Sequence, residues 1–149
     1  MKIKTILATI LFTLIMSVAL AQPKSVKPRS IISTNSSIKT YNERKGLEAM
    51  NKGELIVLYK ERVKLLINML PNIALASKPG ISMSDVGIPD TAETRKALEV
   101  QIQNTSDFVA NTENFQTLFL PYSDKLNIIN CILFYETTLK ALNVLNDTE

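Results

Sequence analysis

The chain has 149 residues, with 17 Lys and Arg against 14 Asp and Glu, one cysteine and no histidine. A single cysteine excludes an intramolecular disulfide and any zinc or iron–sulfur centre built from several thiolates. The lack of histidine removes the most common general base and a very common metal ligand. We therefore expect no catalytic residues, no metal and no cofactor.

The first 21 residues have the pattern of an export signal. Lys2 and Lys4 form a positive start, residues 6–20 form an apolar run, and small residues precede Gln22. A transmembrane helix needs roughly 20 apolar residues, so this run is short for an anchor. We predict cleavage after Ala21, a periplasmic or secreted mature chain, and no integral membrane segment after cleavage.

Charge is distributed unevenly along the exported part. Without Lys2 and Lys4, 15 basic and 14 acidic residues remain, which does not support nucleic-acid binding. Residues 22–45 carry a net charge of +5, and residues 46–149 carry −4. Residues 22–41 are rich in Ser, Pro, Lys and Asn without a helical period, which predicts a disordered basic linker before a helical domain at 42–146. This linker is a tether, or it reaches an anionic surface or an acidic protein partner.

Two helices are expected at the start of the domain. A short leading helix would be capped by Asn42 and would use Leu47 and Met50 as its apolar contacts. Asn51 and Glu54 have the spacing of a capping box, in which each side chain accepts from the other residue's amide. This box predicts the start of a longer helix at 52–76.

The longer helix has apolar residues at spacings of three and four, which place them on one face. Pro71 is expected to kink or end the helix near Leu70, because proline removes a hydrogen bond and crowds the preceding turn. The predicted apolar face consists of Ile56, Tyr59, Val63, Leu66, Leu70 and Ile73.

The connection at 77–89 is longer than most connections between packed helices. Ser82 and Asp85 are spaced to cap one short turn, and Gly87 suits the left-handed conformation that would end it. We expect the loop to fold back over the open end of the bundle; the alternative is a loop that grips a ligand. Its candidate binding residues are Ile81, Met83, Val86 and Ile88.

A helix at 91–120 follows, capped by Asp90 with Glu93 in the reciprocal position, or by Thr91. Its middle is polar, so a break near Asn104 is an alternative and the segment is one helix or two. The residues expected on its inner face are Leu98, Ile102, Val109, Phe115 and Phe119.

Thr105 and Thr112 fall near that inner face. A threonine facing a core usually returns its hydroxyl to the carbonyl one turn earlier. The alternative is a polar niche for a small ligand, so both residues join the candidate binding residues.

The last helix, at 124–145, has the clearest apolar seam, formed by Ile128, Ile132, Tyr135, Leu139 and Leu142. Its apolar face is widened by Cys131, Leu133, Phe134 and Leu145, so it needs cover on more than one side. Pro121 breaks the chain just before it, and the short connection predicts an antiparallel neighbour. Cys131 is interpreted as a small buried apolar residue, or as a thiol that pairs two chains.

Carboxylates are the remaining candidates for acid–base chemistry. Glu61 stands among Lys60, Arg62 and Lys64, which indicates a solvated strip. Glu136 precedes Lys140 by one turn, which indicates an ordinary surface pair. No acid–base pair is apparent, so we predict that the protein is not an enzyme.

These patterns predict an all-α fold, namely a small antiparallel three-helix bundle with coiled-coil-like packing and a short leading helix as a possible fourth member. Two hypotheses for function follow. The protein is an exported interaction protein, or it carries a small ligand or lipid within the bundle. A real cavity among the helices would favour the carrier.

Overall fold

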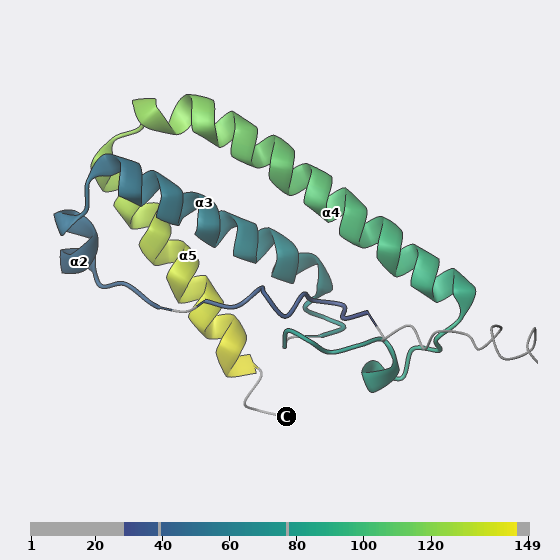
Figure 1. Ribbon diagram of the computed structural model, residues 1–149. Coiled ribbons are helices and arrows are strands. Elements are labelled where there is room, and N and C mark those ends of the chain that lie inside the picture. The colour runs from purple at the N-terminus through teal and green to yellow at the C-terminus, as the bar shows by residue number, and fades with distance from the viewer. Residues whose placement is uncertain (1–28, 39, 77, 146–149) are drawn as a thin grey trace, which may run out of the picture.

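The computed structural model describes residues 29–38, 40–76 and 78–145, which form an all-α bundle (Figure 1). A short helix, α2 (Arg44–Ala49), precedes three longer ones: α3 (Lys52–Met69), α4 (Ala92–Phe119) and α5 (Lys125–Leu145). Three 3-10 turns lie at Leu70–Asn72, Ser84–Val86 and Leu120–Tyr122. The predicted bundle of three helices with a short fourth helix is confirmed. The predicted signal peptide lies outside the described residues.

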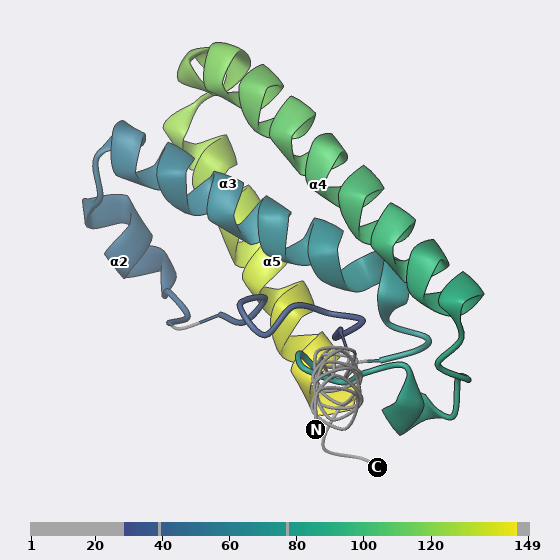
Figure 2. The same ribbon diagram turned by 45° about the vertical axis from the view of Figure 1, so that its right-hand side comes forward.

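Helix α3 is the central element, because it contacts both α4 and α5. Helices α4 and α5 diverge from the turn that joins them, as two views show (Figures 1 and 2). The short connection at Pro121 therefore reverses the chain as expected. The neighbour on which α4 mainly packs is nevertheless α3 and not α5.

The start and the end of α3 follow the local signals. The side chain of Asn51 accepts from the amide of Glu54 at 3.0 Å, and Glu54 accepts from the amide of Asn51 at 2.8 Å, which confirms the capping box. The helix ends at Met69, and a 3-10 turn that contains Pro71 follows it. The expected cap of α2 is wrong, because Glu43 and not Asn42 occupies that position and no side chain caps the helix.

The seam of α5 is confirmed, with Tyr135 half-buried and Ile128, Ile132, Leu139 and Leu142 buried. Phe134, which was expected to widen the covered face, is 65% exposed. The inner face of α3 is rotated from the prediction, because Leu70 is exposed and Arg62 is buried. Helix α3 packs against neighbours on more than one side, so a single stripe does not describe it. The buried residues of α3 are Leu55, Arg62, Leu65, Leu66 and Met69.

Helix α4 is one continuous helix with no break near Asn104. Thr91 caps it: the Thr91 hydroxyl accepts from the amide of Thr94 at 3.1 Å, and the Thr94 hydroxyl accepts from the amide of Thr91 at 3.0 Å. The expected Asp90 cap is wrong, since Asp90 instead pairs with Arg95 at 3.3 Å.

The segment before α2 departs from the prediction of a disordered linker. Within residues 29–38, Ile31 and Ile32 are buried and pack with Met69 and Leu142. The amide of Ile31 donates to the carbonyl of Ile81 at 2.8 Å. This segment and the loop at 78–90 lie together at one end of the bundle, so the predicted fold-back of the loop is confirmed (Figures 1 and 2). The linker prediction is wrong here because the two isoleucines close that end.

Candidate interaction surface

The candidate residues of the 81–88 loop serve mainly the core. The Ser82 hydroxyl and amide donate to one carboxylate oxygen of Asp85 at 2.7 and 2.8 Å, and Gly87 closes the turn with φ 75°. These two hydrogen bonds lower the pKa of Asp85 from its usual value, and the bond from the hydroxyl has the larger effect. Met83 is buried, Ile81 and Ile88 pack against the core, and Val86 is partly exposed.

The six candidate binding residues are not brought together in one site. Met83 and Ile88 line an apolar pocket of about 260 Å³, and Ile81 and Val86 line another of about 230 Å³. Thr105 lines a polar pocket of about 230 Å³ that also includes Arg29.

The Thr105 hydroxyl donates to the carbonyl of Gln101 at 2.9 Å, which confirms the expected bond to the preceding turn. Thr112 lines none of these pockets. The two threonines therefore do not form a shared polar niche.

A buried ion pair joins α3 to α5. Arg62 Nε lies 2.9 Å from Oε1 of Glu136, and the two side chains are 3% and 2% exposed. Arg62 also donates to the carbonyl of Thr40 at 2.8 Å and to the carboxylate of Glu61 at 2.9 Å. Asn42 donates to Glu136 from its backbone amide at 2.6 Å and from its side chain at 2.9 Å.

The expectation that Glu136 forms a surface pair with Lys140 is wrong. The carboxylate is buried and accepts three hydrogen bonds, whereas the Lys140 ammonium lies 4.7 Å from the centre of the Tyr41 ring. Glu61 is exposed, as predicted. This buried carboxylate, held by an arginine and an asparagine, joins α3, α5 and the segment that precedes α2.

Apolar side chains form an exposed stripe on α4, and we call it the aromatic face. Three phenylalanines of this stripe are more than half exposed, at 56–60%, and two of them, Phe115 and Phe119, stack with ring centres 4.5 Å apart. The separations of seven and four residues between the phenylalanines place them on one side of the helix. The aromatic face consists of Val100, Phe108, Phe115, Leu118 and Phe119, and the exposed Tyr122 continues it beyond the helix end.

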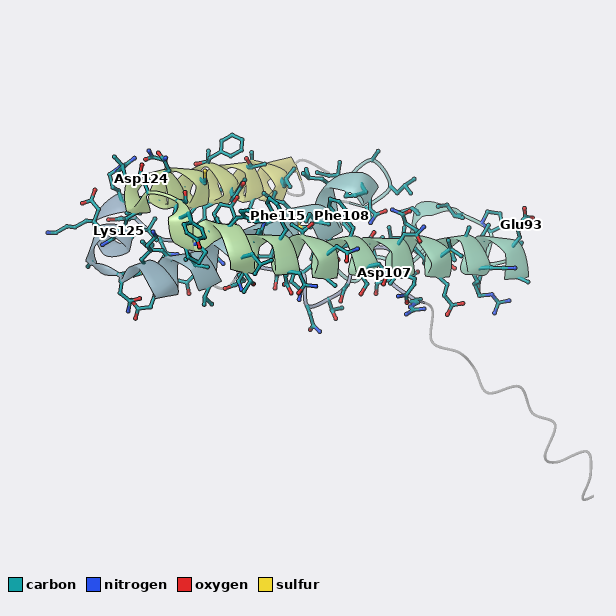
Figure 3. The ribbon with its side chains drawn as sticks, turned by 90° about the horizontal axis from the view of Figure 1, so that it is seen from above. Glu93, Asp107, Phe108, Phe115, Asp124 and Lys125 are labelled. Carbon is teal, nitrogen blue, oxygen red and sulfur yellow. The ribbon has the colours of Figure 1, made fainter. Side chains whose placement is uncertain are left out.

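The aromatic face carries no charge. Between Lys96 and Lys125 the chain has no basic residue. The acidic residues of this stretch of α4 have partners elsewhere: Glu99 pairs with Arg29, Asp107 accepts from Gln103, and Glu113 lies 3.6 Å from the ammonium of Lys64. Figure 3 shows Phe108 and Phe115 on the edge of α4 toward α5, and Asp107 on the opposite edge.

The aromatic face was missed in the sequence because Phe115 and Phe119 were assigned to the inner side of α4. In the structure Gln116 takes the inner position and is buried, and no hydrogen-bond partner to its Oε1 is present among the described residues. A signal was available. Phe108, Phe115 and Phe119 share a helical face about 100° away from Leu98, Ile102 and Val109, so α4 has two apolar stripes.

Helix α5 contains a half-buried tyrosine and a half-buried cysteine. The rings of Tyr59 and Tyr135 meet edge to face at 5.4 Å, and their hydroxyls are 3.2 Å apart. Burial raises the pKa of Tyr135, and the hydrogen bond with Tyr59 raises it further by a smaller amount. Cys131 is half-buried.

No family model matches the chain, and no curated protein or solved structure matches it either. None of the described helices is both long enough and apolar enough to cross a membrane. Within the described ranges, no group of three or more His, Cys, Asp or Glu residues could hold a metal ion. The aromatic face is thus the feature of the described chain that most needs a functional explanation.

Proposed function

We propose that the protein is an exported, non-enzymatic interaction protein that binds a partner polypeptide through the aromatic face. One observation carries the proposal: three exposed phenylalanines stand on one side of α4 without a charged residue among them. The cores of protein–protein interfaces are enriched in aromatic residues and depleted in charged ones. A large contiguous apolar patch on a monomer commonly marks an interaction site.

The chemistry of the face indicates an apolar polypeptide partner. Binding to anionic lipid or nucleic acid depends on lysine and arginine, and residues 97–124 contain neither. Three acidic residues of α4, Glu99, Asp107 and Glu113, have partners within the chain. A partner surface of apolar and aromatic residues would therefore meet no unpaired charge.

Photocrosslinking in the exporting cell tests this proposal. A photoreactive phenylalanine in place of Phe115 should give one adduct of defined mass, which mass spectrometry identifies. The same group in place of Val57, which is exposed on α3 away from the aromatic face, is the control and should give no adduct. With the purified pair, Phe115→Asp should weaken binding by about 30-fold or more, as for an interface hot spot. Equal labelling at both positions, or none at either, would contradict the proposal.

Export is a separate part of the proposal and rests on the pattern of the first 21 residues. The protein recovered from the periplasm or the medium should lack these residues in an intact-mass measurement. A membrane-bound form that retains Met1 would contradict it.

A small-ligand carrier is the second candidate, supported by two adjoining pockets. The apolar pocket of about 260 Å³ and the polar pocket of about 230 Å³ share Ile31, Asn72 and Gln101. Their combined volume falls in the lower half of the range of ligand sites, about 300–1,000 Å³, and would suit an amphipathic molecule. A fluorescent fatty acid should lose its binding on Ala97→Trp, which fills the apolar pocket, and keep it on Phe115→Asp. The reverse pattern would exclude the carrier.

A further inference from the structure

We infer that the partner of the aromatic face is a second copy of this chain, with the two α4 helices packed antiparallel across a two-fold axis. This inference rests on the proposed function and names its partner. Three features of α4 support it: the polar residues within the face, the area of the face, and the spacing of its rings.

The polar residues among the apolar ones of this side of α4 are amides, and the one nearest the two-fold axis is able to pair with its own copy. They are Gln101, Asn104 and Asn111, which are exposed and uncharged. A two-fold interface brings residues near the axis beside their own copies. A charged residue there would meet its own sign, whereas an amide both donates and accepts hydrogen bonds. The aromatic face thus carries the side chains that a self-pairing surface tolerates.

The area also fits a dimer of standard size. With more than half of each ring exposed, the aromatic face and Tyr122 together present roughly 700 Å². A standard interface buries about 800 Å² on each partner, so one such face on each chain comes close to that size. From Val100 to Phe119 the face extends over about 28 Å of helix at 1.5 Å per residue. The stripe is therefore long enough for one helix to lie along another.

The spacing of the rings suggests how two copies would align. In an antiparallel pair whose two-fold axis passes midway between Asn111 and Thr112, Phe108 of each chain lies opposite Phe115 of the other. Phe119 then lies opposite Asn104. This alignment pairs aromatic rings twice, and it leaves the acidic residues of α4 at the edge, where Figure 3 shows Asp107.

Charge exchange at the two facing positions tests the inference. The mature chain should sediment with twice its monomer mass at about 100 µM. This concentration is sufficient because standard interfaces commonly reach micromolar affinity or better. A reductant is present to exclude a disulfide through Cys131. Phe108→Lys with Phe115→Lys should give a monomer, and so should Phe108→Glu with Phe115→Glu. Mixing the two variants should restore a dimer that contains one copy of each.

Both pairs of substitutions fall on exposed positions, so circular dichroism should show an unchanged helix content. The control is Leu126→Asp, which alters an exposed apolar residue of α5 outside the aromatic face and should leave the dimer intact. A monomeric mature chain, dimeric charge variants, or a mixture that stays monomeric would each overturn self-association. If the mature chain is monomeric while Phe115 crosslinks a different protein, the proposed function stands and this inference fails.

Discussion

Arg62 and Glu136 connect three parts of the chain at a single point. The ion pair joins α3 to α5, and contacts from Thr40 and Asn42 add the segment that precedes α2. Two buried charges lose their hydration, so such a pair need not stabilise a fold relative to apolar residues. Removal of one partner is costly, however, because the other charge stays buried.

Glu136→Gln should destabilise the fold by about 3 kcal/mol, at the low end of the range for breaking a buried pair. The low end applies because Arg62 keeps its contact with Glu61. Urea denaturation measures the difference. Glu61→Gln is the matched control and should cost less than about 1 kcal/mol, since Glu61 is half exposed. A similar loss of unfolding free energy in both variants would show that the buried pair contributes no more to stability than an exposed one.

At the scale of the elements, signals carried by nearby residues predicted the structure well. The Asn51–Glu54 box, the stop at Pro71 and the seam of α5 depend on residues within one or two helical turns. Contacts between distant residues were not visible. Arg62 and Glu136 are 74 positions apart, and each alone resembles a surface charge on an amphipathic helix.

Local sequence patterns also could not predict which face of α4 packs against α3. The helix has two apolar stripes, and spacing alone cannot decide which of them faces α3. The aromatic face was consequently hidden in the sequence. The six residues predicted as binding candidates follow from loop composition and threonine positions. The structure distributes five of them over three pockets, and Thr112 lines none of these pockets.

The cap of α4 provides a test at this scale. Thr91→Ala removes the hydroxyl that accepts from Thr94, and it should cost about 1 kcal/mol of unfolding free energy, the usual value of a helix cap. Asp90→Ala should change it by less than about 0.5 kcal/mol, because Asp90 makes only an exposed pair with Arg95. Thermal unfolding of both variants measures this. A larger effect at Asp90 would restore it as the cap.

At the scale of the whole molecule, residues 29–38 belong to the folded domain, because two of them are buried in its core. Ile32 is 1% exposed and belongs to the core cluster that also contains residues of α3 and α5. The described part of the basic segment is therefore held by the same apolar contacts that hold the helices.

Ile32→Ala should destabilise the fold by about 3 kcal/mol through lost burial and a cavity. Ser37→Ala, an exposed change in the same segment, should cost less than about 0.5 kcal/mol. Urea denaturation of both variants gives the comparison. If Ile32→Ala is as mild as the control, the segment is a detached linker after all.

The charge asymmetry between residues 22–45 and the rest of the chain is a second property of the whole molecule. Some of the basic excess contacts the domain itself, since Arg29 pairs with Glu99 at 3.1 Å and Arg44 donates to Asn130 at 2.8 Å. Lys24 and Lys27 lie outside the described residues. If the segment seeks anionic partners, these two lysines are the charges to remove, because their substitution leaves the contacts of Ile31, Ile32 and Asn42 in place.

The mature chain should bind anionic phospholipid vesicles at 10 mM salt more tightly than Lys24→Gln with Lys27→Gln. A lysine near an anionic membrane contributes about 1 kcal/mol, so the double variant should bind roughly 30-fold more weakly in a sedimentation assay. Binding should fade at 0.15 M salt, where the Debye length falls from about 30 Å to about 8 Å. Neutral vesicles are the control. If both proteins bind alike at low salt, the segment acts as a tether, and the interactions of the protein belong to the aromatic face.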